Sequence, residues 1–309
     1  KIFPFGYMGA ISVYVFFFIS GLLITNSLLT NNNWKTYLCS RFFRIWPGLL
    51  VCLLITTSMC FAAYNGSSFT EYWSNAWHYV LNALTMNLKF SINGVYFSTN
   101  EVEKYATSIN GSIWSIPKEV TLYITLLATW FVYVTFGKSK YMITLICILF
   151  ILSPILFPIY GSTSASQKWL ISLFFSGALV AVYKDKITIN WMLPLGLFIL
   201  YKTFHNLPFL HFVALMSIVS FFIWVASTKL IRSIKLKHDI SYGVYIYGWP
   251  VQQLLHFFCP NLNVYVYIIL SVLISYIIGY FSAIYIEEPA IKLSQNINNR
   301  IKKYSNINL

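Results

Sequence analysis

The sequence predicts an all-α polytopic integral membrane protein, and three observations lead to this fold class. Of the 309 residues, 58% are hydrophobic and only 9% are charged, whereas the surface of a soluble domain needs far more charge. Apolar stretches recur from one end of the chain to the other. Many of these stretches approach the roughly 20 residues that a spanning helix requires. Residues 1–309 are therefore predicted to form a single membrane domain, with the bilayer as its solvent.

Stretches without Asp, Glu, Lys or Arg mark the expected helices, about nine in all. They cover residues 8–29, 46–64, 115–136, 141–160, 168–183, 189–204, 209–228, 240–258 and 263–286. The turn sequence Cys259-Pro260-Asn261-Leu262-Asn263 separates the last two of these helices.

Lys and Arg concentrate on alternate links between these helices, so the positive-inside rule orients the chain with residue 1 outside. Residues 290–309 then form a basic cytoplasmic tail, and the expected location is a bacterial inner membrane. The sequence begins at Lys1, already outside. This start predicts an earlier span, so that the full-length protein would have ten spans and both termini in the cytoplasm.

Residues 66–112 differ from the other links, because a helical apolar stripe runs through them between polar residues. The stripe consists of Trp73, Trp77, Val80, Leu84 and Leu88. A span here would move every later link to the opposite side and reverse the Lys/Arg bias. The segment is therefore predicted to be an outer-side loop that contains an interfacial helix.

The net charge of +13 does not indicate nucleic-acid binding, since the basic residues lie in short links, as topology signals do. The five cysteines are scattered, without paired spacing and without a cluster of histidines. They predict small core residues, and no disulfide framework or metal site is expected.

Arg41 and Arg44 are the first candidate functional residues, because their i,i+3 spacing places both guanidinium groups on one helix face. Two such groups suit a phosphate or pyrophosphate. Ordinary anchoring at the cytoplasmic end of a helix explains the same spacing.

The second candidate is the block Asn110-Gly111-Ser112-Ile113-Trp114-Ser115-Ile116-Pro117-Lys118-Glu119, followed by Tyr123. A polar loop enters a helix here, and Glu119 lies about one turn inside it, with Pro117 in the first turn. Glu119 suits a general base, or a group that orients one. An interfacial pair of Lys118 and Glu119 is the structural alternative.

The third candidate, Asp239 to Pro250, begins a helix capped by Asp239 or Ser241 and carries a Tyr-rich face before a proline kink. Tyr and Trp at this density can line a sugar or acyl site, and they also serve as packing residues. Glu287-Glu288-Pro289 is expected to end the last helix. Its carboxylates could pair with Arg41 or Arg44.

Four blocks in this order resemble the membrane acyltransferase-3 family. They are GAISVYVFFFISGLLI (9–24), RFFRIWP (41–47), NGSIWSIPKEVTLY (110–123) and ISYGVYIYGWP (240–250). In the first block, Ser20 and Gly21 would allow close helix packing.

The resemblance implies an enzyme that moves an acyl group, usually acetyl, from cytoplasmic acetyl-CoA to a hydroxyl of an extracytoplasmic glycan such as O-antigen. The implied partners are a glycan or lipid-linked glycan acceptor and the lipid bilayer, without nucleic acid or metal; the oligomeric state is not predicted. Arg41 and Arg44 would hold the CoA phosphates, and Glu119 would be the acidic catalytic residue. The expected substrate-binding residues are Trp114, Ser115, Tyr242, Tyr245 and Trp249.

Two positions depart from the family pattern. The family's principal catalytic His lies in a first helix that this sequence does not contain, so the general base is not assigned. Gly248 stands where many members carry a His.

A transporter or polymerase of polysaccharides or lipid-linked oligosaccharides is the alternative function. A transporter predicts internal repeats or ionisable groups along several spans, whereas residues 141–228 contain few ionisable residues. A polymerase predicts Arg-rich outer loops, and the outer links here contain few basic residues.

Overall fold

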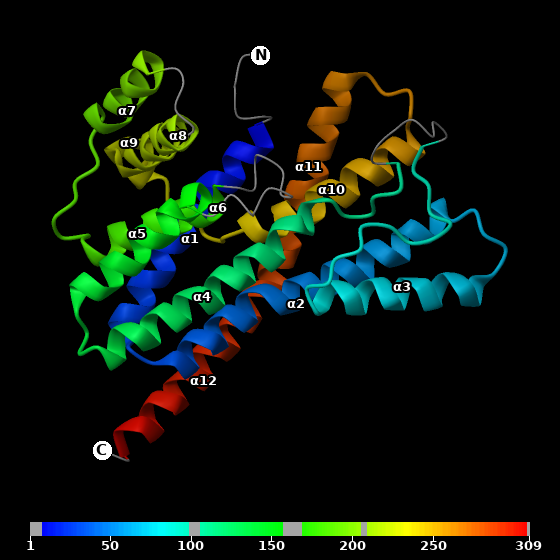
Figure 1. The fold of residues 1–309 in the computed structure, drawn as a ribbon. Coiled ribbons are helices and arrows are strands. Elements are labelled where there is room, and N and C mark those ends of the chain that lie inside the picture. Colours follow the sequence, from blue (N-terminus) through cyan, green and yellow to red (C-terminus); the bar gives the residue numbers. More distant parts are fainter. Residues whose placement is uncertain (1–7, 99–105, 157–168, 205–208, 308–309) are drawn as a thin grey trace. The chain divides into compact units, whose positions relative to one another are not determined.

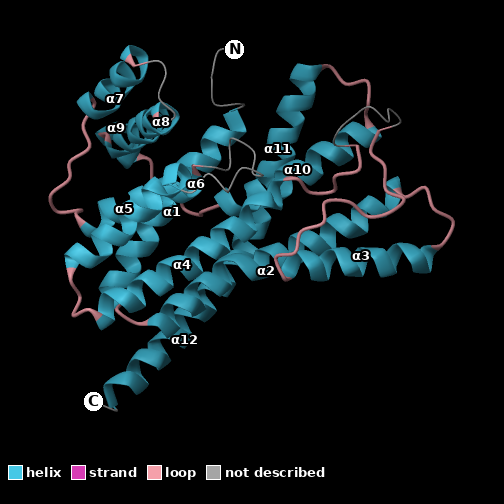
Figure 2. Ribbon diagram, viewed as in Figure 1, coloured by secondary structure: helices cyan, strands magenta, loops and turns pink. Residues whose placement is uncertain are grey.

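The computed structural model describes residues 8–98, 106–156, 169–204 and 209–307 (Figure 1). Regular structure in these ranges is helical, apart from one isolated antiparallel bridge between Tyr64 and Val95. Figure 2 shows helices joined by loops and no strand in the described part of the chain. The predicted all-α fold class is confirmed.

The chain divides into two compact units. The first unit contains Lys1–Trp34 and Glu119–Lys235, and the second contains Lys35–Lys118 and Leu236–Leu309. Each unit therefore combines segments that are distant in the sequence.

The first unit is built around the packing of α1 on α6. Its helices are α1 (Met8–Asn31), most of α4 (Ile116–Thr135), α5 (Lys140–Leu156), α6 (Leu170–Val182), α7 (Met192–Thr203), α8 (Leu210–Ser227) and α9 (Lys229–Ser233). A Cβ atom on Gly21 would lie 1.9 Å from the Phe174 carbonyl oxygen, and one on Gly177 would lie 2.0 Å from that of Phe18. The two helix backbones approach this closely because both contact positions lack side chains, as predicted for Gly21.

The second unit contains the long helix α2 and four further α-helices among the described residues. Its helices are α2 (Trp34–Cys60), α3 (Phe69–Leu84), α10 (Ser241–Phe258), α11 (Val264–Ser282) and α12 (Glu288–Ile307), with 3₁₀ turns η1 (Phe61–Ala63) and η2 (Ser112–Ser115). In Figure 1, α12 runs beside the first half of α2, where Asn298 donates to the Ser40 hydroxyl at 2.9 Å. Tyr72 of α3 donates to the carbonyl oxygen of Thr57 in α2.

Each of the nine predicted segments contains a helix, but the predicted number of spans is not confirmed. Four helical stretches in the described residues are long and apolar enough to cross a membrane: Gly9–Asn31, Trp34–Ala63, Leu210–Ser227 and Val264–Lys303. The helices α5, α6 and α7 are apolar but shorter. The 12 residues of α7 reach only about 18 Å at 1.5 Å per residue, against a hydrocarbon core of about 30 Å. The end of the segment predicted at 141–160 lies outside the described residues.

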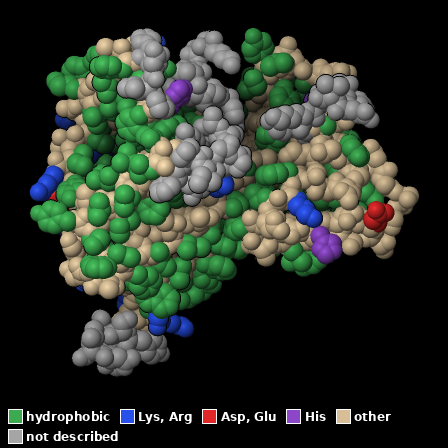
Figure 3. All heavy atoms as spheres, viewed as in Figure 1, with side chains coloured by type: hydrophobic (Ala, Val, Ile, Leu, Met, Phe, Trp, Pro, Cys, Tyr) green, Lys and Arg blue, Asp and Glu red, His purple; other side chains and the backbone are tan. Residues whose placement is uncertain are grey.

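Exposed apolar side chains support a membrane environment for this multi-pass protein. Figure 3 shows hydrophobic side chains over much of the visible face and few charged ones. Exposed examples include Leu23, Ile124, Leu145, Ile269 and Val272, each more than half exposed. Such side chains are stable when lipid, rather than water, surrounds them.

Two predicted boundaries are wrong. Pro289 does not end the last helix, because a π-helical segment (Ala283–Glu287) joins α11 directly to α12. Pro289 lies inside this continuous helix, directly after the π-helical segment. Residues 290–307 therefore continue a helix. In addition, α2 begins at Trp34, before the predicted residue 46, because charged residues mark the edge of the bilayer and do not end a helix.

The helix predicted within 66–112 is present as α3, and Ser68 caps it by accepting the Glu71 N–H at 3.3 Å. Its buried face differs from the predicted stripe and consists of Tyr72, Ala76, Tyr79, Val80 and Ala83. Trp73 and Trp77 are 37% and 55% exposed. The helix thus packs one apolar face on its own unit and leaves its tryptophans outward, as in interfacial helices.

Candidate functional site

A cluster of polar side chains in the second unit surrounds Arg44 on α2. The Nη2 of Arg44 lies 2.7 Å from Oδ2 of Asp239, and the two side chains are 28% and 61% exposed. The sequence predicted Arg44 as an anion-binding residue but did not predict this partner, since 194 residues separate the two positions in the chain.

Asp239 is itself held at the start of α10. Its Oδ1 accepts the Ser241 N–H at 3.2 Å and the Ser241 hydroxyl at 2.6 Å. Burial alone would raise the pKa of Asp239, but the hydrogen bonds from Ser241 and the charge of Arg44 outweigh it and lower the pKa below its ordinary value. The predicted N-cap, Asp239 or Ser241, is wrong, because Ile240 occupies the N-cap position without a side-chain hydrogen bond. Asp239 lies one residue earlier and accepts from Ser241, the first residue of the helix.

Tyr242 supports Arg44 from the other side. The guanidinium carbon of Arg44 lies 6.0 Å from the centroid of the Tyr242 ring, within cation–π distance. The Tyr242 hydroxyl donates to the Ile45 carbonyl at 2.9 Å. Gly48 makes room for the ring, since a Cβ atom there would lie 2.9 Å from Cε1 of Tyr242. The structure therefore brings together two of the predicted site residues, Arg44 and Tyr242.

Arg41 lies about one turn before Arg44 on the same helix and is also partly buried. Because α2 is helical throughout this stretch, the predicted i,i+3 relationship of the two arginines is confirmed. The ion pair found at Arg44 is with Asp239, and Glu288 lies 2.5 Å from Nδ1 of His238. The expected pairing of these carboxylates with Arg41 stays a prediction.

Glu287 is a buried carboxyl group that the sequence analysis assigned to a helix end and to a possible pair with Arg41 or Arg44. It is 2% exposed; its Oε1 accepts the Ser282 hydroxyl at 2.9 Å, and its Oε2 has no partner among the described residues. Gly48 and Gly243 face it, and a Cβ atom on Gly243 would lie 3.0 Å from Oε1. The π-helical segment places it there, and such segments are frequent at functional sites.

A second cluster of hydrogen bonds joins residues 106–115 to α10. It is centred on the Ile246 carbonyl oxygen, which Pro250 leaves without its helical donor. Pro250 has no N–H, so the Ile246 carbonyl loses its helical donor. Asn110 replaces that donor, with Nδ2 at 2.9 Å from the Ile246 oxygen, and the Cys52 thiol lies 3.4 Å from the same oxygen. Asn110 is fully buried.

The aromatic residues of α10 hold this loop from its other side. Tyr245 donates to the Ser112 carbonyl at 2.5 Å, and the Ser115 hydroxyl lies 2.7 Å from the Tyr245 oxygen. Trp249 and Gln253 both donate to the Ser108 carbonyl, at 3.1 and 2.7 Å. Three predicted substrate-binding residues, Ser115, Tyr245 and Trp249, are thus brought together, and they have a structural role here. Trp114 lies in the same 3₁₀ turn and is partly buried.

Glu119 belongs to the first unit and is 7% exposed. Tyr123, one turn later on α4, donates its hydroxyl to Oε1 of Glu119. The Tyr123 ring centroid lies 6.4 Å from that of Phe174 on α6. A buried carboxyl group with a tyrosine partner is suited to accept or orient a proton. The structural alternative, an interfacial pair of the exposed Lys118 with Glu119, stays a prediction.

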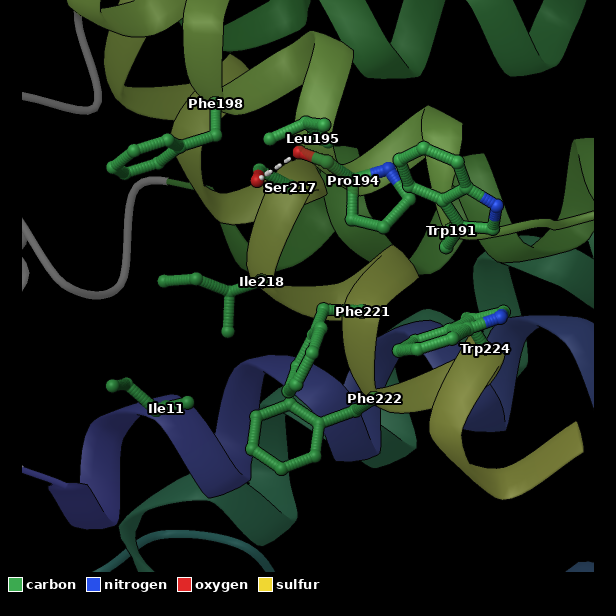
Figure 4. A pocket seen from close by; sticks show the side chains of 10 residues that line it. All are labelled: Ile11, Trp191, Pro194, Leu195, Phe198, Ser217, Ile218, Phe221, Phe222 and Trp224. Atoms are coloured by element: carbon green, nitrogen blue, oxygen red, sulfur yellow. Dashed lines mark hydrogen bonds between the residues drawn. The ribbon is translucent and has the colours of Figure 1, made fainter. Parts of the chain in front are cut away.

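An apolar pocket of about 540 Å³ lies between α1, α7 and α8 of the first unit (Figure 4). Its aromatic lining includes Trp191, Phe198, Phe221, Phe222 and Trp224. Ser217 is a polar residue in this lining, and its hydroxyl donates to the Pro194 carbonyl at 2.7 Å. Among the residues that the structure describes, no ionisable side chain lines the pocket. The described residues also contain no group of three His, Cys, Asp or Glu side chains suited to a metal.

Comparison with known proteins gives the family. The sequence matches the acyltransferase domain family, acyltransferase-3, over residues 1–286. An O-acetyl transferase of Shigella phage Sf6 is 28% identical over 271 residues, which cover 82% of this chain and 76% of the relative. No solved structure matches. Together with the helical architecture and the quoted blocks, the match over residues 1–286 shows that this chain belongs to the membrane acyltransferase-3 family and is an acyltransferase.

Proposed function

We propose that the protein is an O-acetyltransferase that takes acetyl from cytoplasmic acetyl-CoA and delivers it to a hydroxyl of an extracytoplasmic glycan. The family match supports acyl transfer, and the phage relative, named an O-acetyl transferase, supports acetyl as the group transferred to oxygen. The acceptor in this proposal is a glycan or lipid-linked glycan, and the location is the bacterial inner membrane.

The structural observation that carries the proposal is the guanidinium of Arg44, which binds Asp239 and lies over the Tyr242 ring. Arg44 and Arg41 are the proposed ligands of the donor's phosphates, because a guanidinium binds phosphate through several N–H groups with fixed geometry. Anion binding at an arginine that is oriented before the ligand arrives loses less entropy.

In the proposed reaction, the hydroxyl oxygen of the acceptor attacks the thioester carbonyl. The new C–O bond forms, the C–S bond breaks, and the proton of the hydroxyl passes to a base and then to the thiolate of CoA. Glu119 is the proposed acidic residue that accepts this proton or orients the base. Trp114, Ser115, Tyr242, Tyr245 and Trp249 are the proposed residues of the acceptor site and its walls.

The function is tested by mass spectrometry and NMR of surface polysaccharide from cells with and without the full-length gene. Loss of one O-acetyl group at unchanged chain length supports the proposal and identifies the acceptor sugar. Unchanged acetylation with shortened or missing polysaccharide contradicts it and favours the alternative, a transporter or polymerase.

A second arm uses the Arg41→Ala/Arg44→Ala double variant in the same cells. The proposal expects acetylation to disappear while the protein remains in the membrane. Arg232→Ala removes an equally basic residue from the exposed helix α9 and is the matched control.

A further inference from the structure

The guanidinium of Arg44 is held in place before any ligand arrives, and Asp239 is the residue that holds it. The pair meets at 2.7 Å through one oxygen, Oδ2, and one nitrogen, Nη2. We propose that Asp239 is a positioning residue for Arg44, fixing the guanidinium so that its remaining N–H groups meet a phosphate of the donor. This inference rests on the proposed function, because it requires a phosphate-bearing donor at Arg44.

Asp239 is a rigid anchor because its neighbours fix it on both sides. Ser241 donates to Oδ1 through its backbone N–H and its hydroxyl, at 3.2 and 2.6 Å. On the other side, Nδ1 of His238 lies 2.5 Å from the Glu288 carboxylate on α12. Two residues that precede α10 therefore connect this helix to its neighbours, Asp239 to α2 and His238 to α12. A carboxylate in this link has little freedom to follow a moving arginine.

The geometry favours positioning over competition with the donor. Oδ1 of Asp239 is occupied by Ser241, so the carboxylate contacts Arg44 through one oxygen and does not form a bidentate pair. Arginine has five N–H donors, and the contact with Oδ2 uses one of them. The ring of Tyr242, 6.0 Å from the guanidinium carbon, restricts the plane of the group. A long side chain with many rotamers is thus limited to one region, which reduces the entropy lost on binding.

If Asp239 instead competed with the donor for Arg44, removing its charge would change donor affinity in the opposite direction. One variant therefore distinguishes the two roles. Asp239 is negatively charged and would repel an anionic donor or compete with it for Arg44. Since its side chain is 61% exposed, water screens this repulsion. Replacing Asp239 with Asn keeps the size and removes the charge. Positioning predicts weaker donor binding in this variant, and competition predicts tighter binding.

The experiment measures acetyl-CoA binding and transfer with the purified full chain in lipid nanodiscs. Asp239→Asn is expected to weaken acetyl-CoA binding about tenfold and to raise KM, with kcat at saturation nearly unchanged. Asp239→Glu, which restores the charge on a longer side chain, should recover part of the loss. Ser241→Ala, which releases Oδ1, should show a smaller loss. Asp185→Asn, an exposed position in the first unit, is the matched control and should bind as the wild type does.

A double-mutant cycle separates positioning from a general structural effect. In an Arg44→Ala background, Asp239→Asn should cause no further loss, because the side chain that it positions is gone. Additive losses, or equal or tighter binding by Asp239→Asn alone, would overturn the inference while leaving the proposed function intact. A wild-type protein that does not bind acetyl-CoA would overturn the proposed function itself, and this inference with it.

Discussion

Asn110 donates through Nδ2 to the Ile246 carbonyl oxygen at 2.9 Å, in the place of the backbone N–H that Pro250 lacks. A loop side chain therefore completes the hydrogen bonding of α10 at its proline. The same side chain accepts the Ser112 N–H at 3.1 Å through Oδ1 and so shapes the loop that precedes α4.

Asn110→Ala should destabilise the protein by about 1–3 kcal/mol, because it leaves the buried Ile246 carbonyl without its amide donor. Thermal unfolding in detergent measures the change. Pro250→Ala restores the helical N–H, so the double variant Asn110→Ala/Pro250→Ala should lose less than the sum of the two single variants. A strictly additive result would show that Asn110 stabilises the protein through the loop alone.

Gly177→Ala should destabilise the first unit strongly, since its Cβ would lie 2.0 Å from the Phe18 carbonyl oxygen and force α1 and α6 apart. Overpacking of this kind typically costs about 1–3 kcal/mol or more. Gly196→Ala is the matched control, because nothing lies within 4 Å of the added Cβ. Expression level and thermal midpoint should fall for the first variant and hold for the second; equal behaviour would contradict the close packing of the two helices.

The Arg41→Ala/Arg44→Ala variant should lose acetyl-CoA binding, because the proposed phosphate ligands are removed. Isothermal titration with acetyl-CoA measures the affinity, and Arg232→Ala controls for the loss of positive charge. Unchanged affinity in the double variant would remove the donor-binding role from both arginines.

Glu119→Gln should lower the rate of acetyl transfer by about 10²–10⁴ while acetyl-CoA still binds, as expected when a general base is lost. Tyr123→Phe removes the hydroxyl that donates to Glu119 and should cause a smaller fall in rate. Radiolabelled acetyl transfer and donor binding are measured on the same preparations. A normal rate in Glu119→Gln would exclude the proposed acid–base role.

The ion pair of Arg44 and Asp239 should stabilise the protein at neutral pH and lose this effect in acid. The pKa of Asp239 is lower in the folded protein than its ordinary value, so the folded state favours the charged form. The stabilisation is complete above the ordinary Asp pKa of about 3.9 and disappears as the pH falls through the lowered pKa. Because Asp239 is 61% exposed, the effect is small, within about 1 kcal/mol.

The pH dependence of the thermal midpoint checks this effect, with Asp239→Asn as the reference. The difference between the wild type and the variant should be present at pH 6–7 and should vanish on acidification. A difference that persists unchanged in acid would show that the two side chains are not coupled through ionisation.

Much of the fold follows from one-dimensional patterns. Uncharged apolar stretches mark helices because a bilayer requires every backbone group to be bonded within its own segment, and each predicted segment contains a helix. Gly21 marks a close helix contact for another local reason, because it has no side chain to keep the two helices apart. The i,i+3 spacing of Arg41 and Arg44 likewise needs only helix geometry. Where a local rule was applied too strictly, as at Pro289, the prediction was wrong.

Only the tertiary structure decided which residues meet. Asp239 binds Arg44, His238 binds Glu288, and Asn110 completes the helix at Pro250, although each pair joins distant parts of the sequence. The amino-acid sequence determined the helices, their apolar character and the family, since these depend on local pattern and on whole-chain similarity. Pairing depends on helix rotation and on close contacts permitted by residues such as Gly48. Those are set by the packing of several helices at once, which spacing along one segment does not encode.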